Sequence, residues 1–253
     1  MPRKVLGVIP ARFDSSRFPG KALARIGPKT MLQHVFERAL LSKYLTCITI
    51  ATDDERIAAE ARHFGAPVRM TRPDHLSGTD RVAEAAAADN AELIVNIQGD
   101  EPLIDPAAID AAVLPLAGDP EIPMGTLKKL IEDPHELDDP NVVKVVTDAC
   151  GNALYFSRSR IPFARDHAAS APPAFKHIGL YVYRREFLLG YSDLPVGPLE
   201  RTERLEQLRA LENGYPIRVV ETEYESIGVD TPADLEKVKR LFEASISSVH
   251  PYA

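Results

Sequence analysis

The sequence predicts an α/β fold with a mainly parallel sheet flanked by helices and a smaller antiparallel β region in the second half. Apolar runs of strand length alternate with amphipathic segments of helical length through the first part of the chain, which is typical of βαβ units. The second half has several strand-like runs with few helices between them. The chain has 253 residues, of which 45% are hydrophobic and 26% charged, so it can build a large core without disulfides.

The first half of the chain shows the alternation most clearly. Strands are predicted at 5–9, 47–54, 66–70 and 92–102, and helices at 31–41, 55–65 and 79–88. Met31, Val35 and Ala39 recur at helical spacing, and Gly65 ends the second helix. This order predicts a Rossmann-like sheet, which binds ligands at the carboxyl ends of its strands.

From about Met124 the pattern changes. Strands are predicted at 124–130, 142–148, 153–158, 176–183 and 216–223. One helix is predicted over 198–214, ended by Asn213-Gly214, and a last helix over 231–245, with Thr231 as its N-cap and Asp234 in the capping-box position. We expect residues 1–253 to form a single domain that contains an antiparallel region at about 124–198.

Composition excludes several classes of protein. The net charge of −7 argues against sequence-independent binding to nucleic acid, which requires a basic surface. No apolar run approaches the roughly 20 residues that span a bilayer, and the chain enters its first strand without a charged and then apolar leader. Cys47 and Cys150 are far apart and form no CxxC pattern. We therefore expect a cytoplasmic protein with no membrane or nucleic-acid partner.

The segment after the first strand, "IPARFDSSRFPGKAL" (9–23), gathers Arg12, Arg17 and Lys21 around Gly20. It contains neither GxGxxG nor GxxxxGK[ST], the two familiar phosphate-binding loops. Arg and Lys side chains would therefore carry most of any anion binding. A local anion site in an acidic chain is one interpretation, and a solvated loop with scattered basic residues is the other.

Two aspartates are candidate ligands of a metal ion. Asp100 lies in "NIQGDEP" (96–102), directly after a buried strand, where a carboxylate suits Mg²⁺ that also contacts phosphate. The alternative is a polar turn in which Gly99 has a positive φ. Asp230, in "GVDTPADL" (228–235), could cap the following helix or be a second ligand of the same metal. Sequence distance does not show whether the two meet.

The segment "MTRPDHLSGTDR" (70–81) places Arg72, His75, Ser77 and Gly78 together after a predicted strand. Backbone and hydroxyl groups there could hold a base or a ribose. The same segment also fits a helix entry with Ser77 or Thr79 as its cap.

Polar side chains also follow the later strands. Arg158 and Arg160 in "YFSRSRIP" are candidates for binding a carboxylate or phosphate, and His177 and Tyr181 share one strand face. Single histidines are more often structural than catalytic, and the histidines here form no zinc pattern.

Together these segments resemble the 3-deoxy-manno-octulosonate (Kdo) cytidylyltransferase family over nearly the whole chain, from "IPARFDSSRFPGKAL" to "GVDTPADLEKV". The first loop and "QGDEP" are shared with sugar nucleotidyltransferases in general. "ALYFSR", "HIGLY" and "LEQLR" favour the Kdo family over its sialic-acid relatives. The resemblance implies a fold of the nucleotide-diphospho-sugar transferase type and a reaction in which CTP and Kdo give CMP-Kdo and pyrophosphate.

The resemblance also implies roles for residues and partners. Those implied for the triphosphate are Arg12, Ser15, Arg17 and Lys21; for cytidine, Met70, Arg72, Ser77, Gly78 and Gln98; for Mg²⁺, Asp100 and Asp230; and for the sugar acid, Gln98, Arg158, His177, Tyr181, Glu206 and Gln207. Of these, Arg12, Lys21, Asp100 and Asp230 would be catalytic. The family is cytoplasmic, usually homodimeric, and supplies lipopolysaccharide synthesis, so region 124–198 is expected to serve sugar binding and dimerisation.

Other functions remain open at this point. The chain could be a cytidylyltransferase for another acid sugar, such as 8-amino-Kdo or a sialic acid. A non-catalytic nucleotide-binding module is a further alternative, against which both aspartates and all three loop cations argue. An NAD oxidoreductase is disfavoured because GxGxxG is missing.

Overall fold

The computed structural model describes residues 4–14, 17–75, 77–165 and 173–249, with side chains through residue 244. The chain divides into two compact units. Unit 1 contains residues 91–95 and 108–225, and unit 2 contains residues 4–90, 96–107 and the segment from 226 onward. That residues 1–253 act as a single domain stays a prediction.

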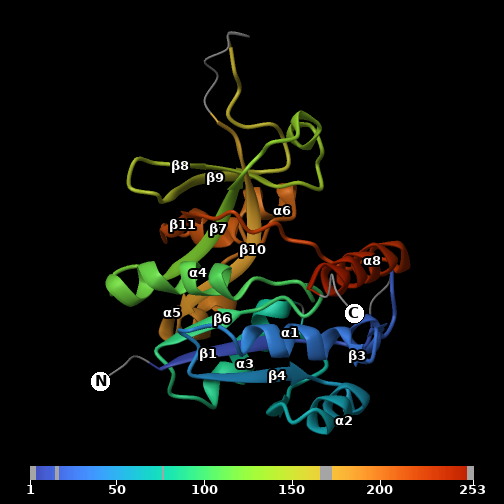
Figure 1. The fold of residues 1–253 in the computed structure, drawn as a ribbon. Coiled ribbons are helices and arrows are strands. Elements are labelled where there is room, and N and C mark those ends of the chain that lie inside the picture. The colour runs from blue at the N-terminus through green and yellow to red at the C-terminus, as the bar shows by residue number, and fades with distance from the viewer. Residues whose placement is uncertain (1–3, 15–16, 76, 166–172, 250–253) are drawn as a thin grey trace. The chain divides into compact units, whose positions relative to one another are not determined.

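Unit 2 is built on a parallel sheet. Its strands are β1 (Val5–Pro10), β4 (Cys47–Thr52) and β5 (Val68–Met70). β1 and β4 lie side by side (Figure 1), with Ile9 opposite Ile50. The helices are α1 (Met31–Ala39), α2 (Glu55–His63), α3 (Gly78–Ala87) and α8 (Pro232–Val249), and the short elements are η1 (Lys21–Leu23), β2 (Arg25–Ile26) and β3 (Lys29–Thr30). The predicted alternation of strands and helices is confirmed here.

Short polar side chains set where these helices begin. Thr30 accepts a hydrogen bond from the N–H of Gln33 at the start of α1, and Asp54 accepts one from Arg56 at the start of α2. Ser77 and Asp80 form a complete capping box on α3. Thr231 and Asp234 bond to each other's backbone N–H groups, as the sequence predicts for α8.

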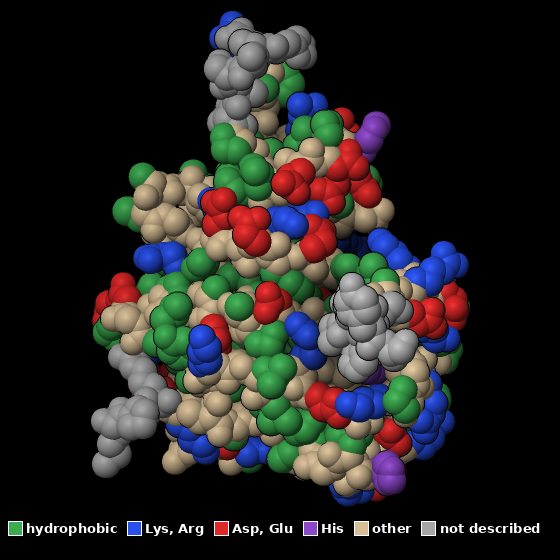
Figure 2. Space-filling model, in the orientation of Figure 1, with side chains coloured by type: hydrophobic (Ala, Val, Ile, Leu, Met, Phe, Trp, Pro, Cys, Tyr) green, Lys and Arg blue, Asp and Glu red, His purple; other side chains and the backbone are tan. Residues whose placement is uncertain are grey.

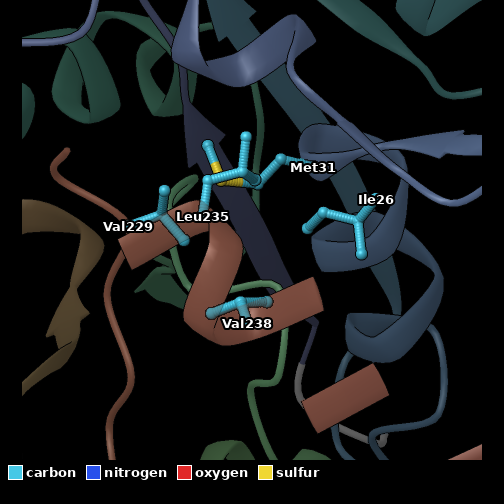
Figure 3. Close-up of a cluster of buried hydrophobic side chains, with 5 residues drawn as sticks. All are labelled: Ile26, Met31, Val229, Leu235 and Val238. Atoms are coloured by element: carbon cyan, nitrogen blue, oxygen red, sulfur yellow. The ribbon is translucent and has the colours of Figure 1, made fainter. Parts of the chain in front are cut away.

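An apolar cluster anchors α8 in unit 2 and determines where Asp230 lies. Ile26, Met31, Val229, Leu235 and Val238 come from β2, α1, α8 and the segment before α8, and their side chains converge in Figure 3. Val229 is fully buried, and burial of such a side chain contributes about 1.5–3 kcal/mol. Because Val229 is fixed, the adjacent Asp230 is held at a defined place.

Unit 1 contains the antiparallel region. β10 (Phe175–Arg184) runs antiparallel to β7 (Met124–Leu130) and to β8 (Lys144–Thr147), which in turn pairs with β9 (Ala153–Ser157). β11 (Ile217–Glu221) lies parallel to β7 on its other side, and β6 (Leu93–Asn96) adjoins β10. The helices are α4 (Pro106–Gly118), α5 (Arg185–Leu189), α6 (Pro198–Glu203) and α7 (Leu208–Glu212), with short 3₁₀ turns η2 (Pro134–Leu137) and η3 (Tyr191–Asp193). The predicted antiparallel part is confirmed.

Two helical segments differ from the sequence prediction. No element is predicted for 106–118, yet α4 occupies it, with Pro115 inside the helix. The single helix predicted over 198–214 is wrong, because Arg204 ends α6 in the left-handed region at φ 55° and α7 starts only at Leu208.

The surface carries both signs of charge. On the face drawn in Figure 2, Lys and Arg side chains are interspersed with Asp and Glu side chains and do not form one broad basic patch. Among the described residues, no helix combines the length and the hydropathy needed to cross a membrane.

Candidate active site

Unit 2 contains a cavity of about 300 Å³ beyond the end of β1. The described residues that line it are Pro10, Ala11, Arg12, Arg17, Lys21, Ala22, His75, Ser77, Gly78, Arg81, Gln98, Gly99, Asp100 and Asp230. The loops that follow parallel strands supply most of this lining, as expected for a Rossmann-like sheet. Four Lys and Arg side chains but only two Asp side chains line the cavity. It is therefore a cationic site in a chain of net charge −7.

Lys21 lies at the centre of the charged groups. Its Nζ donates to Asp100 Oδ2 at 2.5 Å, to Asp230 Oδ1 at 3.1 Å and to the Val229 carbonyl at 3.2 Å. An ammonium group has three N–H donors, so all three are used. The two aspartates, which lie far apart in the chain, meet at this one side chain.

The neighbouring carboxylates keep Lys21 charged. Burial of the Lys21 ammonium alone would lower its pKa, but the Asp100 and Asp230 carboxylates outweigh burial and raise the pKa above its ordinary value. Arg17 adds a second cation, with its Nη2 3.0 Å from Asp230 Oδ2. Arg12 is exposed and lines the same cavity.

Two direct bonds join the segments that carry the aspartates. The N–H of Val229 donates to the Asp100 carbonyl at 2.9 Å. The Ser226 hydroxyl donates to the buried Glu101 carboxylate at 2.7 Å. The sequence analysis offered a positive φ as the reason for a glycine at position 99. This prediction is wrong, because Gly99 is not among the glycines with positive φ. A Cβ on Gly99 would lie 2.8 Å from the Pro10 carbonyl, and glycine is required because this turn approaches the end of β1 so closely.

The donor set at Lys21 fits a small divalent cation. Asp100, Asp230 and the Val229 carbonyl direct three oxygens at one ammonium, and Mg²⁺ prefers such hard oxygen ligands with few protein carboxylates. Within the described part of the chain, no group of three or more His, Cys, Asp or Glu side chains forms a metal cluster. The two aspartates with one carbonyl are thus the metal-compatible group that this cavity offers.

A second group of predicted residues gathers in unit 1, around β10. The rings of His177 and Tyr181 lie 5.4 Å apart, and Phe156 on β9 meets His177 edge-on at 5.0 Å. Burial lowers the pKa of His177 to about 3. Burial, Tyr191 and the Glu206 carboxylate raise the pKa of Tyr181 well above its ordinary value. Both side chains are therefore neutral at pH 7.

Arg158 connects β9 to the turn between α6 and α7. Its guanidinium donates to the carbonyls of Glu203, Pro140 and Arg204. The backbone N–H of Arg158 donates to the Glu203 carboxylate at 3.0 Å. Gln207, just after this turn, is buried.

Comparison with known proteins identifies the family of the chain. A model of the family described as cytidylyltransferase matches residues 6–227. A 3-deoxy-manno-octulosonate cytidylyltransferase of Solibacter usitatus is 75% identical over 97% of this chain and 97% of its own. A 3-deoxy-manno-octulosonate cytidylyltransferase of Syntrophotalea carbinolica is 59% identical over 93% of this chain and 97% of its own. The chain belongs to the Kdo cytidylyltransferase family. A structure of CMP:2-keto-3-deoxy-manno-octonic acid synthetase complexed with CTP is 44% identical, covers 96% of this chain and 99% of its own, and superposes with a TM-score of 0.92.

The family resemblance and the fold type predicted from the sequence are confirmed. In this cytidylyltransferase, the residues predicted for the triphosphate and the metal converge in the unit 2 cavity, except Ser15, which lies outside the described residues.

The residues predicted for cytidine divide into two sets. Ser77, Gly78 and Gln98 line the cavity. Met70 and Arg72 do not line it: Met70 is 47% exposed, and Arg72 pairs with Asp74 at 2.6 Å. Their role in this cytidylyltransferase stays a prediction.

Sequence reasoning assigned no specific role to two titratable side chains of the cavity, Arg81 and His75. Arg81 is buried, donates to the Thr71 hydroxyl and pairs with Asp53 at 3.1 Å, so it joins the loops after β4 and β5. His75 hydrogen-bonds to Glu84. Its position in the sequence could have marked Arg81 as a candidate. Arg81 is the one cation in the predicted helix 79–88, and it adjoins the apolar Val82.

Proposed function

We propose that this protein transfers the CMP group of CTP to the anomeric hydroxyl of Kdo, giving CMP-Kdo and pyrophosphate. The observation that carries the proposal is the Lys21 ammonium between Asp100 and Asp230 in a cation-lined cavity. Relatives that are 75% and 59% identical over nearly the whole chain are named for this activity.

The cations of the cavity suit the charge that develops in this reaction. Attack on the α-phosphate places negative charge on the reacting group and on the departing pyrophosphate, so catalysis depends on positioning and electrostatics. We assign Arg12, Arg17 and Lys21 to the triphosphate. Gly78, at the start of α3, lines the same cavity, and a helix N-terminus favours phosphate. No covalent intermediate on the protein is needed.

We assign Asp100 and Asp230 to Mg²⁺. A bound ion there would neutralise phosphate charge and polarise the attacking hydroxyl. Lys21 already bonds to both carboxylates, so the ammonium and a metal ion compete for the same oxygens. When the metal ion takes these carboxylate oxygens, the Lys21 ammonium becomes available to donate to phosphate. The competition therefore links metal binding to nucleotide binding.

For the nucleoside we assign Met70, Arg72, Ser77, Gly78 and Gln98, and for the sugar acid Gln98, Arg158, His177, Tyr181, Glu206 and Gln207. The neutral His177 and Tyr181 suit the hydroxyl groups of a sugar, and Arg158 suits its carboxylate.

We further propose that the protein is a cytoplasmic homodimer that supplies activated Kdo for lipopolysaccharide synthesis. Light scattering on the purified protein tests the dimer, and a single mass near 27.8 kDa would contradict it.

The decisive experiment measures pyrophosphate release from CTP and Mg²⁺ with a panel of Kdo, 8-amino-Kdo and a sialic acid. We expect Kdo to be the best acceptor. The Asp100→Ala variant should lose at least about 10²-fold in rate while keeping its fold by circular dichroism, and Asp193→Ala, at an exposed aspartate of unit 1, is the control. Preference for another sugar would overturn the acceptor, and no release with any sugar would overturn the reaction.

A further inference from the structure

β10 is irregular just after His177. Ile178 pairs with Leu127, whereas Val182 pairs with Gly125, so the register shifts between them. Two carbonyls of the irregular stretch face one hydroxyl: Thr126 Oγ1 lies 3.0 Å from the Ile178 oxygen and 2.9 Å from the Leu180 oxygen. The same Oγ1 lies 2.9 Å from Nε2 of His177. Thr126 is fully buried on β7.

The hydrogen-bonding capacity of these groups fixes where the protons are. A threonine hydroxyl has one proton to donate, and a carbonyl oxygen can only accept. If the hydroxyl proton pointed at His177, both carbonyls would face the hydroxyl lone pairs without a proton between them. The proton therefore goes to a carbonyl, and the hydroxyl oxygen accepts from the ring. Nε2 of His177 must then carry a hydrogen.

The other ring nitrogen follows from this assignment. A neutral imidazole carries one hydrogen, so Nδ1 has a free lone pair. The residue as a whole is only partly buried. Its described contacts, besides Thr126, are with the rings of Phe156 and Tyr181, and no described residue hydrogen-bonds to Nδ1. The tyrosine, the titratable neighbour in ring contact, keeps its hydroxyl proton because its pKa is raised.

We propose that Thr126 is a positioning residue that fixes His177 as the Nε2–H tautomer, so that Nδ1 accepts a hydrogen bond from a hydroxyl group of the acceptor sugar. This inference rests on the proposed function for the identity of the acceptor. It gives His177 a defined selectivity: a substrate hydroxyl can donate to Nδ1, whereas a carboxylate, which has only acceptors, cannot pair with it.

The tautomer is tested without any substrate. Nitrogen-15 NMR of histidine-labelled protein separates protonated from unprotonated ring nitrogens, and the His177→Gln variant assigns the signal. We expect Nε2 protonated and Nδ1 unprotonated in the wild type. Thr126→Val should release the preference so that the Nδ1–H form appears, and Thr126→Ser, which keeps the hydroxyl, should restore it. A wild-type signal with the hydrogen on Nδ1 would overturn the assignment even if Thr126→Val failed to fold.

Kinetics separate positioning from general destabilisation. Thr126→Val should raise KM for the sugar about fivefold, the loss expected for one hydrogen bond, and leave KM for CTP within about twofold. The matched control is Thr49→Val, which removes another buried threonine hydroxyl bond, 3.3 Å long, in unit 2. An equal rise in both KM values, or the same change in the Thr49 variant, would make Thr126 a merely structural residue.

Sugar analogues test what Nδ1 receives. The analogues are made from whichever acid sugar the wild type uses. In the wild type, one deoxy analogue should react more slowly than the parent sugar. In His177→Phe, that analogue and the parent sugar should react at the same rate. The penalty for amidating the sugar carboxylate should be the same in both proteins. If the carboxylate penalty vanished instead, the hydroxyl assignment would be wrong. A wild type that uses no sugar would overturn the proposed function and the hydroxyl acceptor together, and the NMR result would still decide the role of Thr126.

Discussion

Lys21 is the residue on which both aspartates of the cavity converge, and its replacement tests its two proposed roles, triphosphate binding and competition with the metal ion. Lys21→Met keeps an unbranched side chain as long as the aliphatic part of lysine and removes the ammonium. We expect kcat/KM for CTP to fall about 10²–10³-fold, as for loss of a group that stabilises a transition state. Because the competing cation is gone, the free protein should bind Mn²⁺ at least about tenfold more tightly. Pyrophosphate release and electron paramagnetic resonance of unbound Mn²⁺ measure the two effects.

Lys29 provides the control for that variant. It pairs with Glu37 at 2.5 Å on the surface of unit 2, and both side chains are 39% exposed. Lys29→Met should leave CTP use and Mn²⁺ binding unchanged. If Lys21→Met weakened Mn²⁺ binding, the ammonium would be a support of the metal site and not its competitor.

His177 predicts a specific dependence of stability on pH. Its pKa is lowered from 6.5 to about 3 in the folded chain, so between these values the unfolded chain binds more protons. The free energy of unfolding therefore rises with pH up to about 6.5 and is then constant. When the pH is lowered from 7 to 5, the free energy of unfolding should fall by about 2 kcal/mol more in the wild type than in His177→Gln.

Urea unfolding at both pH values measures that difference. His63→Gln, at an exposed histidine near the end of α2, is the control and should behave as the wild type. Equal pH dependence in the wild type and in His177→Gln would contradict a neutral, desolvated ring.

At the scale of elements, the helices of unit 2 were predictable because caps and apolar spacing agree. α1, α2, α3 and α8 each begin at a residue whose type marks a start. α4 was missed because Pro115 and Gly118 obscure it, although its buried residues recur at helical spacing. The break at Arg204 has no local signal, since Arg is a good helix former and the left-handed turn depends on tertiary contacts.

That turn predicts a stabilising substitution. Arg204 has φ 55°, a conformation that costs a residue with a Cβ about 1–2 kcal/mol. Arg204→Gly should raise the free energy of unfolding by about 1 kcal/mol, because glycine removes the strain and keeps the carbonyl that accepts from Arg158. Arg204→Ala is the matched control, since alanine also loses the side chain but retains the strain. Urea unfolding compares the three, and equal stability of the Gly and Ala variants would exclude backbone strain as the cause.

At the scale of the whole molecule, the sequence located the cations and carboxylates of the site but not their meeting. Asp100 and Asp230 belong to segments joined by Val229 and Ser226, and no spacing in the sequence encodes those contacts. The family resemblance supplied the pairing. The bond network around Arg81 was likewise invisible, because it depends on two loops that come together only in the folded sheet.

The division of the chain predicts where each substrate protects the backbone. The cavity proposed to bind the nucleotide is lined by unit 2, and the cluster around His177 belongs to unit 1. In hydrogen-exchange mass spectrometry, saturating CTP alone should slow exchange about tenfold or more in peptides covering 17–23, 77–81 and 97–101. Kdo alone should slow exchange in peptides covering 153–158 and 176–183. With Lys21→Met the CTP effect should shrink while the Kdo effect persists. Protection of 176–183 by CTP that exceeded its protection of 17–23 would contradict this assignment, because the triphosphate would then be held by unit 1.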